Sequence, residues 1–315
     1  MRRFCCRLVV VFCLLCTAVE IFARERTAAP ITSLVISKNG ETVVAGSQLG
    51  IQLLAWDGLK VQRELEFDFQ QLHDIALSAD ESVLAIAGGN PAEFGSVKLY
   101  SWPGLNLIWE QQLSEDVAYA AAFAGDSLAV ACHDHSIHLL QASSGNLVRT
   151  LRGHSKPVTG VCCLKDRQLL MSCSLDQTIR VWDLATGKPV RSLTNHTNSV
   201  NELGVLPTPE GELPKVVSVS SDRTARFWQP TIGRMVRFKR MGSPATAVAC
   251  SSDGAHVFVG TEDQRLRSVD VQSLQMKEIK IEKDGWINAI AVHPTESSLV
   301  IGTSNGSVRK VTVVK

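Results

Sequence analysis

One apolar pattern recurs seven times in this chain of 315 residues, at intervals of 41 to 45 residues. Each copy has an apolar residue, two residues of any kind, and then two apolar residues spaced two apart, as in Ile31, Leu34 and Ile36. The copies begin at Ile31, Leu72, Val117, Val158, Val200, Ala245 and Ile287. A fixed period of this length is typical of domains that stack one small structural unit many times. We therefore expect one repetitive domain rather than two unrelated ones.

The residues within each copy favour short strands. Apolar runs such as VLAIAG, VVSVSS and VFVGT are separated by polar turns such as SKNGE, SADES and SSDGA. Alternation with period two, bounded by Gly, Asp, Asn and Ser, indicates antiparallel strands, whereas almost no segment has the helical period. Four strands in a repeat of about 40 to 45 residues are typical of propeller blades. We predict an all-β fold, a single seven-bladed β-propeller of four-stranded antiparallel blades, over residues 19–315.

The fourth repeat carries the most complete motif. Gly153 and His154 precede the run SCSLDQTIRVWD at residues 172–183. This stretch resembles the repeat of the WD-repeat β-propeller family, and the resemblance covers the chain from Ile31 onward. In that family a His, a Ser or Thr, the Asp of a turn and a Trp form a hydrogen-bonded tetrad. The resemblance implies two structural tetrads, His154, Ser174, Asp176 and Trp182 in blade four and His196, Ser220, Asp222 and Trp228 in blade five. A buried indole and a buried imidazole each need a partner, which suits these residue types.

The other repeats depart from the motif. The turn Asp persists as Asp134 and Asp263, but Asn305 replaces it in the last repeat. The positions equivalent to the Trp are Leu140, Val269 and Val311. Trp56 aligns with Trp102 in the turn after the third strand, so we assign Trp56 no tetrad role and expect Trp56→Ala to be milder than Trp182→Ala.

Two groups of residues invite a chemical interpretation. His154, Ser174 and Asp176 have the residue types of a hydrolase triad, but no GxSxG motif is present and the set recurs in two blades, which favours a structural role. His133 and His135 have a spacing that a metal could use, but a third ligand is missing. We expect Asp134 to be the carboxylate of the turn and both histidines to be exposed. We therefore predict no catalytic residue, no metal and no cofactor.

The first residues have the pattern of an export signal. Arg2, Arg3 and Arg7 precede an apolar stretch from Leu8 to Cys16, which is shorter than the roughly 20 residues that span a bilayer. Small residues at Cys16 and Ala18 indicate cleavage after Ala18, with a poorer site after Ala23. We predict a signal peptide at residues 1–18, a periplasmic or extracellular location and no membrane insertion after cleavage. A retained signal anchor is the alternative.

Five cysteines remain after such cleavage: Cys132, Cys162, Cys163, Cys173 and Cys250. They lie in apolar runs, where a cysteine usually behaves as a small buried side chain, and they lack the paired spacing of a zinc site. A disulfide scaffold is therefore not indicated, although one bridge between strands of a blade stays open.

The charge balance argues against binding to nucleic acid. The chain has 32 Lys and Arg against 31 Asp and Glu, a net charge of +1, so it has no long-range field to attract phosphates. Arg234, Arg237, Lys239 and Arg240 form a local basic run that we place on the outermost strand of blade five. Charges there keep a sheet edge from pairing with other chains.

These observations favour an exported, bacterial-type member of the family that acts as a non-enzymatic scaffold or binding module with a monomeric fold. Its partner is a protein or peptide that docks on the face formed by the turns between second and third strands and by the loops between blades. We predict that this partner site includes Phe94, His135, Arg223, Arg265 and Trp286. The alternative is a propeller enzyme, or a binder of a small ligand or metal, that acts at the mouth of the channel.

The last repeat is too short for four strands, because only 29 residues run from Ile287 to Lys315. By its distance from Ile31, the segment from Val19 to Arg24 corresponds to the missing strand. We predict that it pairs with the strand at Ser307–Val314 and closes the ring, with a three-stranded last blade as the alternative.

Overall fold

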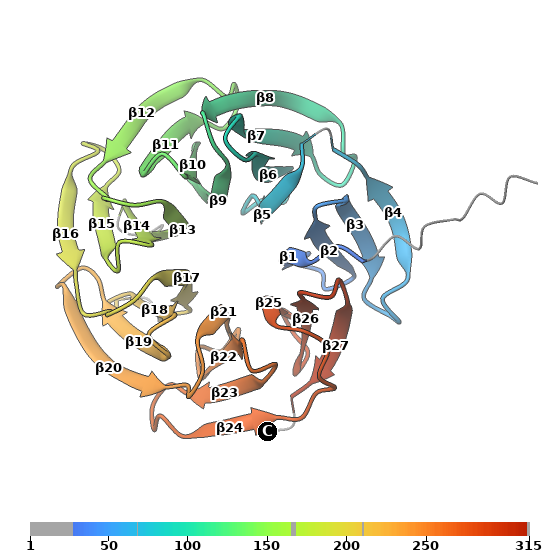
Figure 1. The fold of residues 1–315 in the computed structure, drawn as a ribbon, viewed down its shortest axis with the longest axis vertical. Coiled ribbons are helices and arrows are strands. Elements are labelled where there is room, and N and C mark those ends of the chain that lie inside the picture. Colours follow the sequence, from blue (N-terminus) through green and yellow to red (C-terminus); the bar gives the residue numbers. More distant parts are fainter. Residues whose placement is uncertain (1–27, 68, 165–167, 210, 314–315) are drawn as a thin grey trace, which may run out of the picture.

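The computed structural model describes residues 28–67, 69–164, 168–209 and 211–313, which form a disc of seven sheets around a central axis (Figure 1). Six sheets have four strands, and the seventh has three within the described residues. Strands that are neighbours in a sheet are antiparallel. The predicted seven-bladed β-propeller is therefore confirmed. Within the same described ranges, no helix has the length and apolar character needed to cross a membrane.

Each blade runs in chain order from its innermost to its outermost strand. Blade one is β1 (Ile31–Ile36), β2 (Thr42–Ser47), β3 (Gly50–Ala55) and β4 (Val61–Leu65). Blade two is β5 (Gln71–Leu77), β6 (Val83–Asn90), β7 (Phe94–Ser101) and β8 (Leu107–Ser114). Blade three is β9 (Ala118–Ala124), β10 (Ser127–Cys132), β11 (Ser136–Gln141) and β12 (Leu147–Arg152).

The remaining blades follow the same order. Blade four is β13 (Val158–Leu164), β14 (Leu169–Ser174), β15 (Ile179–Asp183) and β16 (Pro189–Leu193). Blade five is β17 (Val200–Leu206), β18 (Lys215–Ser220), β19 (Thr224–Gln229) and β20 (Arg234–Arg240). Blade six is β21 (Ala245–Cys250), β22 (His256–Thr261), β23 (Leu266–Asp270) and β24 (Met276–Ile279). Blade seven is β25 (Ile287–Val292), β26 (Ser298–Thr303) and β27 (Val308–Thr312).

A β-bulge explains the uneven apolar spacing at the start of the repeats. Ile31 pairs with Ser47 and Ser33 pairs with Gly46, so Thr32 is an extra residue in β1. The same shift of register occurs near the start of β5, β13, β17, β21 and β25. A bulge moves the alternation of side chains by one residue. The first two apolar residues of each copy are therefore three apart, and the next two are two apart.

The second strand of a blade is buried on both faces, whereas the fourth is half exposed. Almost every residue of β14 and β18 is buried, which accounts for their continuous apolar sequences. In β20, which carries the basic run at residues 234–240, exposed and half-buried residues alternate. The hydrophobic core is thus a ring of clusters between adjacent blades, and one cluster joins Ile31 and Trp56 of blade one to Val300 of blade seven.

The outer strands of the first five blades each send one side chain to the next blade. At the same register position, an Arg or Trp donates a hydrogen bond to a carbonyl in the turn that follows the third strand of the neighbouring blade. The bonds are Arg63 to Pro103 (3.5 Å), Trp109 to Ala142 (2.9 Å), Arg149 to Thr186 (2.6 Å), Arg191 to Thr231 (3.1 Å) and Arg237 to Val271 (3.2 Å). The basic residue Arg237 therefore connects two blades, a role beyond protecting an edge.

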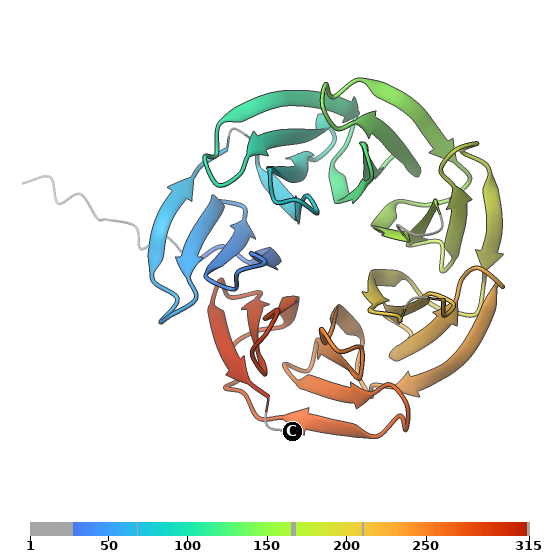
Figure 2. The same cartoon turned by 180° about the vertical axis from the view of Figure 1, so that it is seen from behind.

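The disc has two loop faces, seen from opposite sides in Figures 1 and 2. We call the face with the turns between second and third strands and the loops between blades the b–c face. The opposite face, with the turns after the first and third strands, is the a–b face. The predicted signal peptide and the predicted closing strand, residues 19–24, lie outside the described residues. Ala28 and Ala29 lie against the b–c turn of blade seven, 2.6 Å from where a side chain at Gly306 would begin.

Candidate functional site

The tetrad of blade four links three elements by buried hydrogen bonds. His154, in the loop before β13, contacts the Asp176 carboxylate through Nδ1 at 2.8 Å and the Ser172 hydroxyl through Nε2 at 2.8 Å. Trp182 of β15 donates from Nε1 to Ser172 Oγ at 2.8 Å. A carboxylate only accepts, so the imidazole proton lies on Nδ1. Burial raises the pKa of Asp176, but its hydrogen bonds with His154 and Thr178 outweigh burial and hold that pKa well below its usual range.

Blade five repeats this arrangement. His196 contacts Asp222 Oδ2 at 2.7 Å and Ser218 Oγ at 2.7 Å, and Trp228 Nε1 donates to Ser218 at 2.8 Å. Burial lowers the pKa of His196, against the opposing effect of Asp222. In both blades the tetrad fixes the inter-blade loop, the b–c turn and the third strand relative to one another.

The serine in each tetrad differs from the expected one. Ser172 and Ser218 make the contacts, whereas Ser174 and Ser220, expected from the resemblance, lie two residues closer to the turn. The Ser174 hydroxyl donates to the Lys156 carbonyl at 3.1 Å and accepts from the Asp176 amide at 3.0 Å. Residues two apart on a strand share a face, so the sequence pattern suits either serine. The geometry also does not support a hydrolase triad. The serine that contacts His154 is Ser172, and its side chain is fully buried.

Blade three has a different polar cluster at the equivalent place. Asp134 forms the b–c turn, as expected, and accepts from the Ser136 amide at 3.0 Å. His138 of β11 is buried, and its Nε2 lies 2.9 Å from Ser136 Oγ and 3.4 Å from Asp134 Oδ2. One ligand atom from each of Cys132, Asp134 and His138 falls within 4.8 Å of the others. These three residue types can together hold a metal ion.

The two histidines first considered as metal ligands are placed differently. His133 Nδ1 contacts Asp116 at 3.1 Å, and the His133 side chain is partly exposed. His135 is exposed at the tip of the turn, where its φ is 68°. The histidine that contacts Asp134 is instead His138, which lies four residues after it on the next strand and which the metal interpretation of the sequence did not include.

The five residues predicted to bind a partner lie at the b–c face, four of them in turns or loops and Phe94 at the start of β7, but they come from five different blades. His135 and Arg223 occupy equivalent turn positions with positive φ and are exposed. Arg265 lies one position later in its turn, and it forms ion pairs with Asp263 at 3.5 Å and Glu278 at 2.8 Å. Phe94 is partly buried against the core between blades one and two.

Trp286 is the large apolar side chain among these five that is exposed, with 49% of its surface accessible. Its backbone is held rigidly, because the Trp286 amide donates to Ser304 Oγ at 3.0 Å and the Ser304 amide donates to the Trp286 carbonyl at 2.9 Å. The indole is thus presented from a fixed position beside the b–c turn of blade seven.

A polar cavity of about 360 Å³ lies on the axis and is lined by residues of all seven innermost strands. Asp74 accepts from Ser33 Oγ at 2.9 Å and from the Ala121 amide at 2.9 Å, and Glu202 accepts from the Val248 amide at 2.7 Å. Both carboxyl groups therefore connect adjacent blades. Burial raises the pKa of Asp74 to about 6 and that of Glu202 to about 8.

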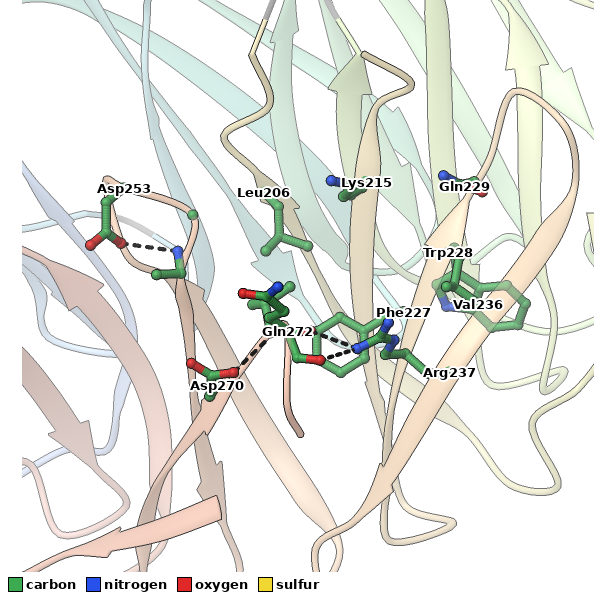
Figure 3. A pocket seen from close by; sticks show the side chains of 13 residues that line it. Leu206, Lys215, Phe227, Trp228, Gln229, Val236, Arg237, Asp253, Asp270 and Gln272 are labelled. Carbon is green, nitrogen blue, oxygen red and sulfur yellow. Dashed lines mark hydrogen bonds between the residues drawn. The ribbon is translucent and has the colours of Figure 1, made fainter. Parts of the chain in front are cut away.

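A groove of about 430 Å³ lies between blades five and six on the a–b face (Figure 3). Asp253 and Asp270 stand on the blade-six side, and Lys215 and Arg237 on the blade-five side. Phe227 contributes an apolar surface between them. This groove lies on the face opposite the predicted partner site, and no sequence signal marked it.

Comparison with known proteins places these features in context. The family described as "WD domain, G-beta repeat" matches residues 145–183 and 187–229, which contain both tetrads. Nuclear distribution protein nudF of Aspergillus niger is 31% identical over 185 residues, covering 58% of this chain and 41% of that protein. Both comparisons support the WD40 repeat family. The expected resemblance to WD-repeat propellers is confirmed at this level.

Two further WD40 relatives extend the comparison. Nuclear distribution protein PAC1 of Arthroderma otae is 27% identical over 233 residues, which is 59% of this chain and 50% of that protein. A guanine nucleotide-binding protein subunit beta-like protein of Encephalitozoon cuniculi is 26% identical over 173 residues, 50% of this chain and 51% of that protein. The chain spans about half the length of these relatives or less. They are eukaryotic, so they do not support the expected bacterial-type member.

Proposed function

We propose that this chain is a protein-binding scaffold whose partner docks on the b–c face around Trp286. The exposed indole on a rigid backbone carries the proposal, because Trp is enriched among the residues that dominate binding energy at protein interfaces. The stiff disc holds this side chain in place, so little entropy is lost when the partner binds.

The relatives add support of a different kind. One of them is named a guanine nucleotide-binding protein subunit beta-like protein. Its name thus likens it to a subunit, and a subunit works within an assembly. His135 and Arg223 would contribute exposed polar groups around the same face. Arg265 would contribute less, since its guanidinium is engaged by Asp263 and Glu278.

Variants with one exposed apolar side chain removed test the proposal. Wild type, Trp286→Ala and the control Ile232→Ala would each be immobilised, and the proteins captured from extracts of the source cells would be quantified by mass spectrometry. Ile232 is 48% exposed and lies in a turn of the a–b face. We expect Trp286→Ala to reduce capture of the partner roughly tenfold or more at an unchanged melting temperature. Equal capture by all three chains would contradict the b–c site.

We also propose that the scaffold acts outside the cytoplasm. The positive residues Arg2, Arg3 and Arg7 followed by a short apolar stretch support export. Fractionation of the source cells should find the chain in the exported fraction, and replacing Leu14 and Leu15 with Arg should retain it inside. An unchanged distribution in that variant would refute export through this segment.

A further inference from the structure

Blade three differs from blades four to six at two of three positions around the b–c turn. In blades four and five the second strand ends in a Ser. The turn that follows contains an Asp, and an Arg lies four positions after that Asp. The full sets are Ser174, Asp176 and Arg180; Ser220, Asp222 and Arg226; and, in blade six, Thr261, Asp263 and Arg267. In blade three they are Cys132, Asp134 and His138. The hydroxyl and the guanidinium, which are poor metal ligands, are thus both replaced by metal-binding types in the same blade.

We propose that Cys132, Asp134 and His138 form a zinc-binding site. The three side chains offer one sulfur, one oxygen and one nitrogen, all within 4.8 Å of one another. Ligand atoms around tetrahedral Zn²⁺ are about 3.5 Å apart, given metal distances of about 2.0 to 2.3 Å. Contraction by roughly an ångström brings the set to zinc geometry, and water takes the fourth position.

The surroundings of His138 orient it for this role. Its Nδ1 lies 3.4 Å from Thr150 Oγ1, while Nε2 faces Ser136 and Asp134. A metal-binding histidine commonly donates its second ring N–H to a neighbouring oxygen, which fixes the tautomer and the ring. With Nδ1–H donated to Thr150, the Nε2 lone pair is available to the ion. Ser136 Oγ stays bonded to Asp134 Oδ1, at 2.6 Å, and orients that carboxylate.

Access and proton balance also suit a bound ion. The Asp134 side chain is 30% exposed, so an ion reaches the site from the b–c face, while Cys132 and His138 are buried behind it. On binding, the Cys132 thiol gives its proton to solvent and the thiolate binds Zn²⁺. The complex of one thiolate, one carboxylate and Zn²⁺ is neutral, which limits the cost of its partial burial.

The experiment titrates the purified full chain, freed of metal by a chelator, with Zn²⁺ in a calorimeter and with Co²⁺ in an absorption spectrometer. We expect one equivalent of Zn²⁺ to bind, and Co²⁺ to give the charge-transfer band of a thiolate ligand. Cys132→Ser and His138→Arg should each weaken binding about tenfold or more. Cys250→Ser and His133→Gln are controls that change a cysteine and a histidine outside the set, and they should bind as the wild type does.

His138→Arg keeps the proposal testable if Cys132→Ser does not fold, because Arg occupies this position in blades four to six. Zn²⁺ should raise the melting temperature of the wild type and leave that of His138→Arg unchanged. The proposal is overturned if the wild type binds no Zn²⁺ at micromolar concentration, or if His138→Arg binds it as tightly as the wild type.

Discussion

Trp182 donates its indole N–H to Ser172 Oγ at 2.8 Å, and both side chains are almost completely removed from water. The Ser172 hydroxyl in turn donates to His154 Nε2. One hydroxyl therefore satisfies two buried ring nitrogens. Loss of such an atom costs the desolvation of each partner that is left without a hydrogen bond.

Ser172→Ala should consequently destabilise the chain by about 2 kcal/mol or more, since it leaves two buried polar atoms unsatisfied. Ser174→Ala is the matched control. The partners of Ser174 are backbone atoms of the exposed Lys156 and the partly exposed Asp176, so water can replace its hydroxyl at about 1 kcal/mol. Urea denaturation of both variants measures the difference. If Ser174→Ala lowered the free energy of unfolding more than Ser172→Ala does, Ser174 and not Ser172 would be the serine of the tetrad.

The difference between these serines shows what sequence periodicity can and cannot specify. Strand starts such as Val158, Val200 and Ile287 were predicted at the observed residues, because burial against both neighbouring blades imposes a strong apolar pattern. Two serines two residues apart lie on the same face of the strand. The alternation of apolar and polar residues does not show which of them is close enough to the indole to bond with it. His138 was not predicted for a related reason: it lies on β11 and Asp134 in the turn before it, and their contact depends on the conformation of that turn.

Trp56→Ala should be far more destabilising than its place in a turn suggested. The Trp56 side chain is buried, its ring lies 4.3 Å from that of His293, and Lys310 Nζ lies 3.9 Å from the ring centroid. Its removal leaves a cavity between blades one and seven, and such truncations cost about 3–5 kcal/mol. Thermal unfolding of Trp56→Ala beside Trp182→Ala compares the two. A decrease in the free energy of unfolding below about 1 kcal/mol for Trp56→Ala would show that the side chains at this interface repack and fill the cavity.

Glu202 makes stability depend on pH in a direction opposite to that of most carboxyl groups. Burial raises its pKa from 4.5 to about 8, so the folded chain holds a proton that the unfolded chain has released between these values. Stability from this group is present in full at low pH and falls as pH rises toward 8. The slope is at most ~1.4 kcal/mol per pH unit. Asp74, with its pKa raised to about 6, acts in the same direction at lower pH.

Glu202→Gln isolates this contribution. The amide carbonyl can still accept from the Val248 amide, but it does not titrate. Urea denaturation at pH 6 and pH 9 should show a smaller decrease for Glu202→Gln than for the wild type, with the variant the more stable at pH 9. Equal decreases in the two proteins would show that Glu202 titrates near its ordinary value.

The last prediction concerns the edge of blade seven. Within the described residues, β27 has a partner strand only on its inner side, whereas the third strand of every other blade is paired on both sides. The described chain already approaches this blade, because Ala28 and Ala29 lie against the turn at Gly306. We therefore keep the prediction that residues 19–24, which precede them in the sequence, form a strand that pairs with β27 and closes the ring.

We expect a chain that begins at Val19 to unfold at a clearly higher temperature than one that begins at Arg24, because only the first retains the whole predicted strand. An unpaired edge also invites association between chains, so the shorter chain should aggregate sooner in light scattering. Replacing Ile21 with Pro in the longer chain removes one backbone N–H from the same strand without shortening it. If all three chains melt together, blade seven is complete with three strands and residues 19–24 do not close the ring.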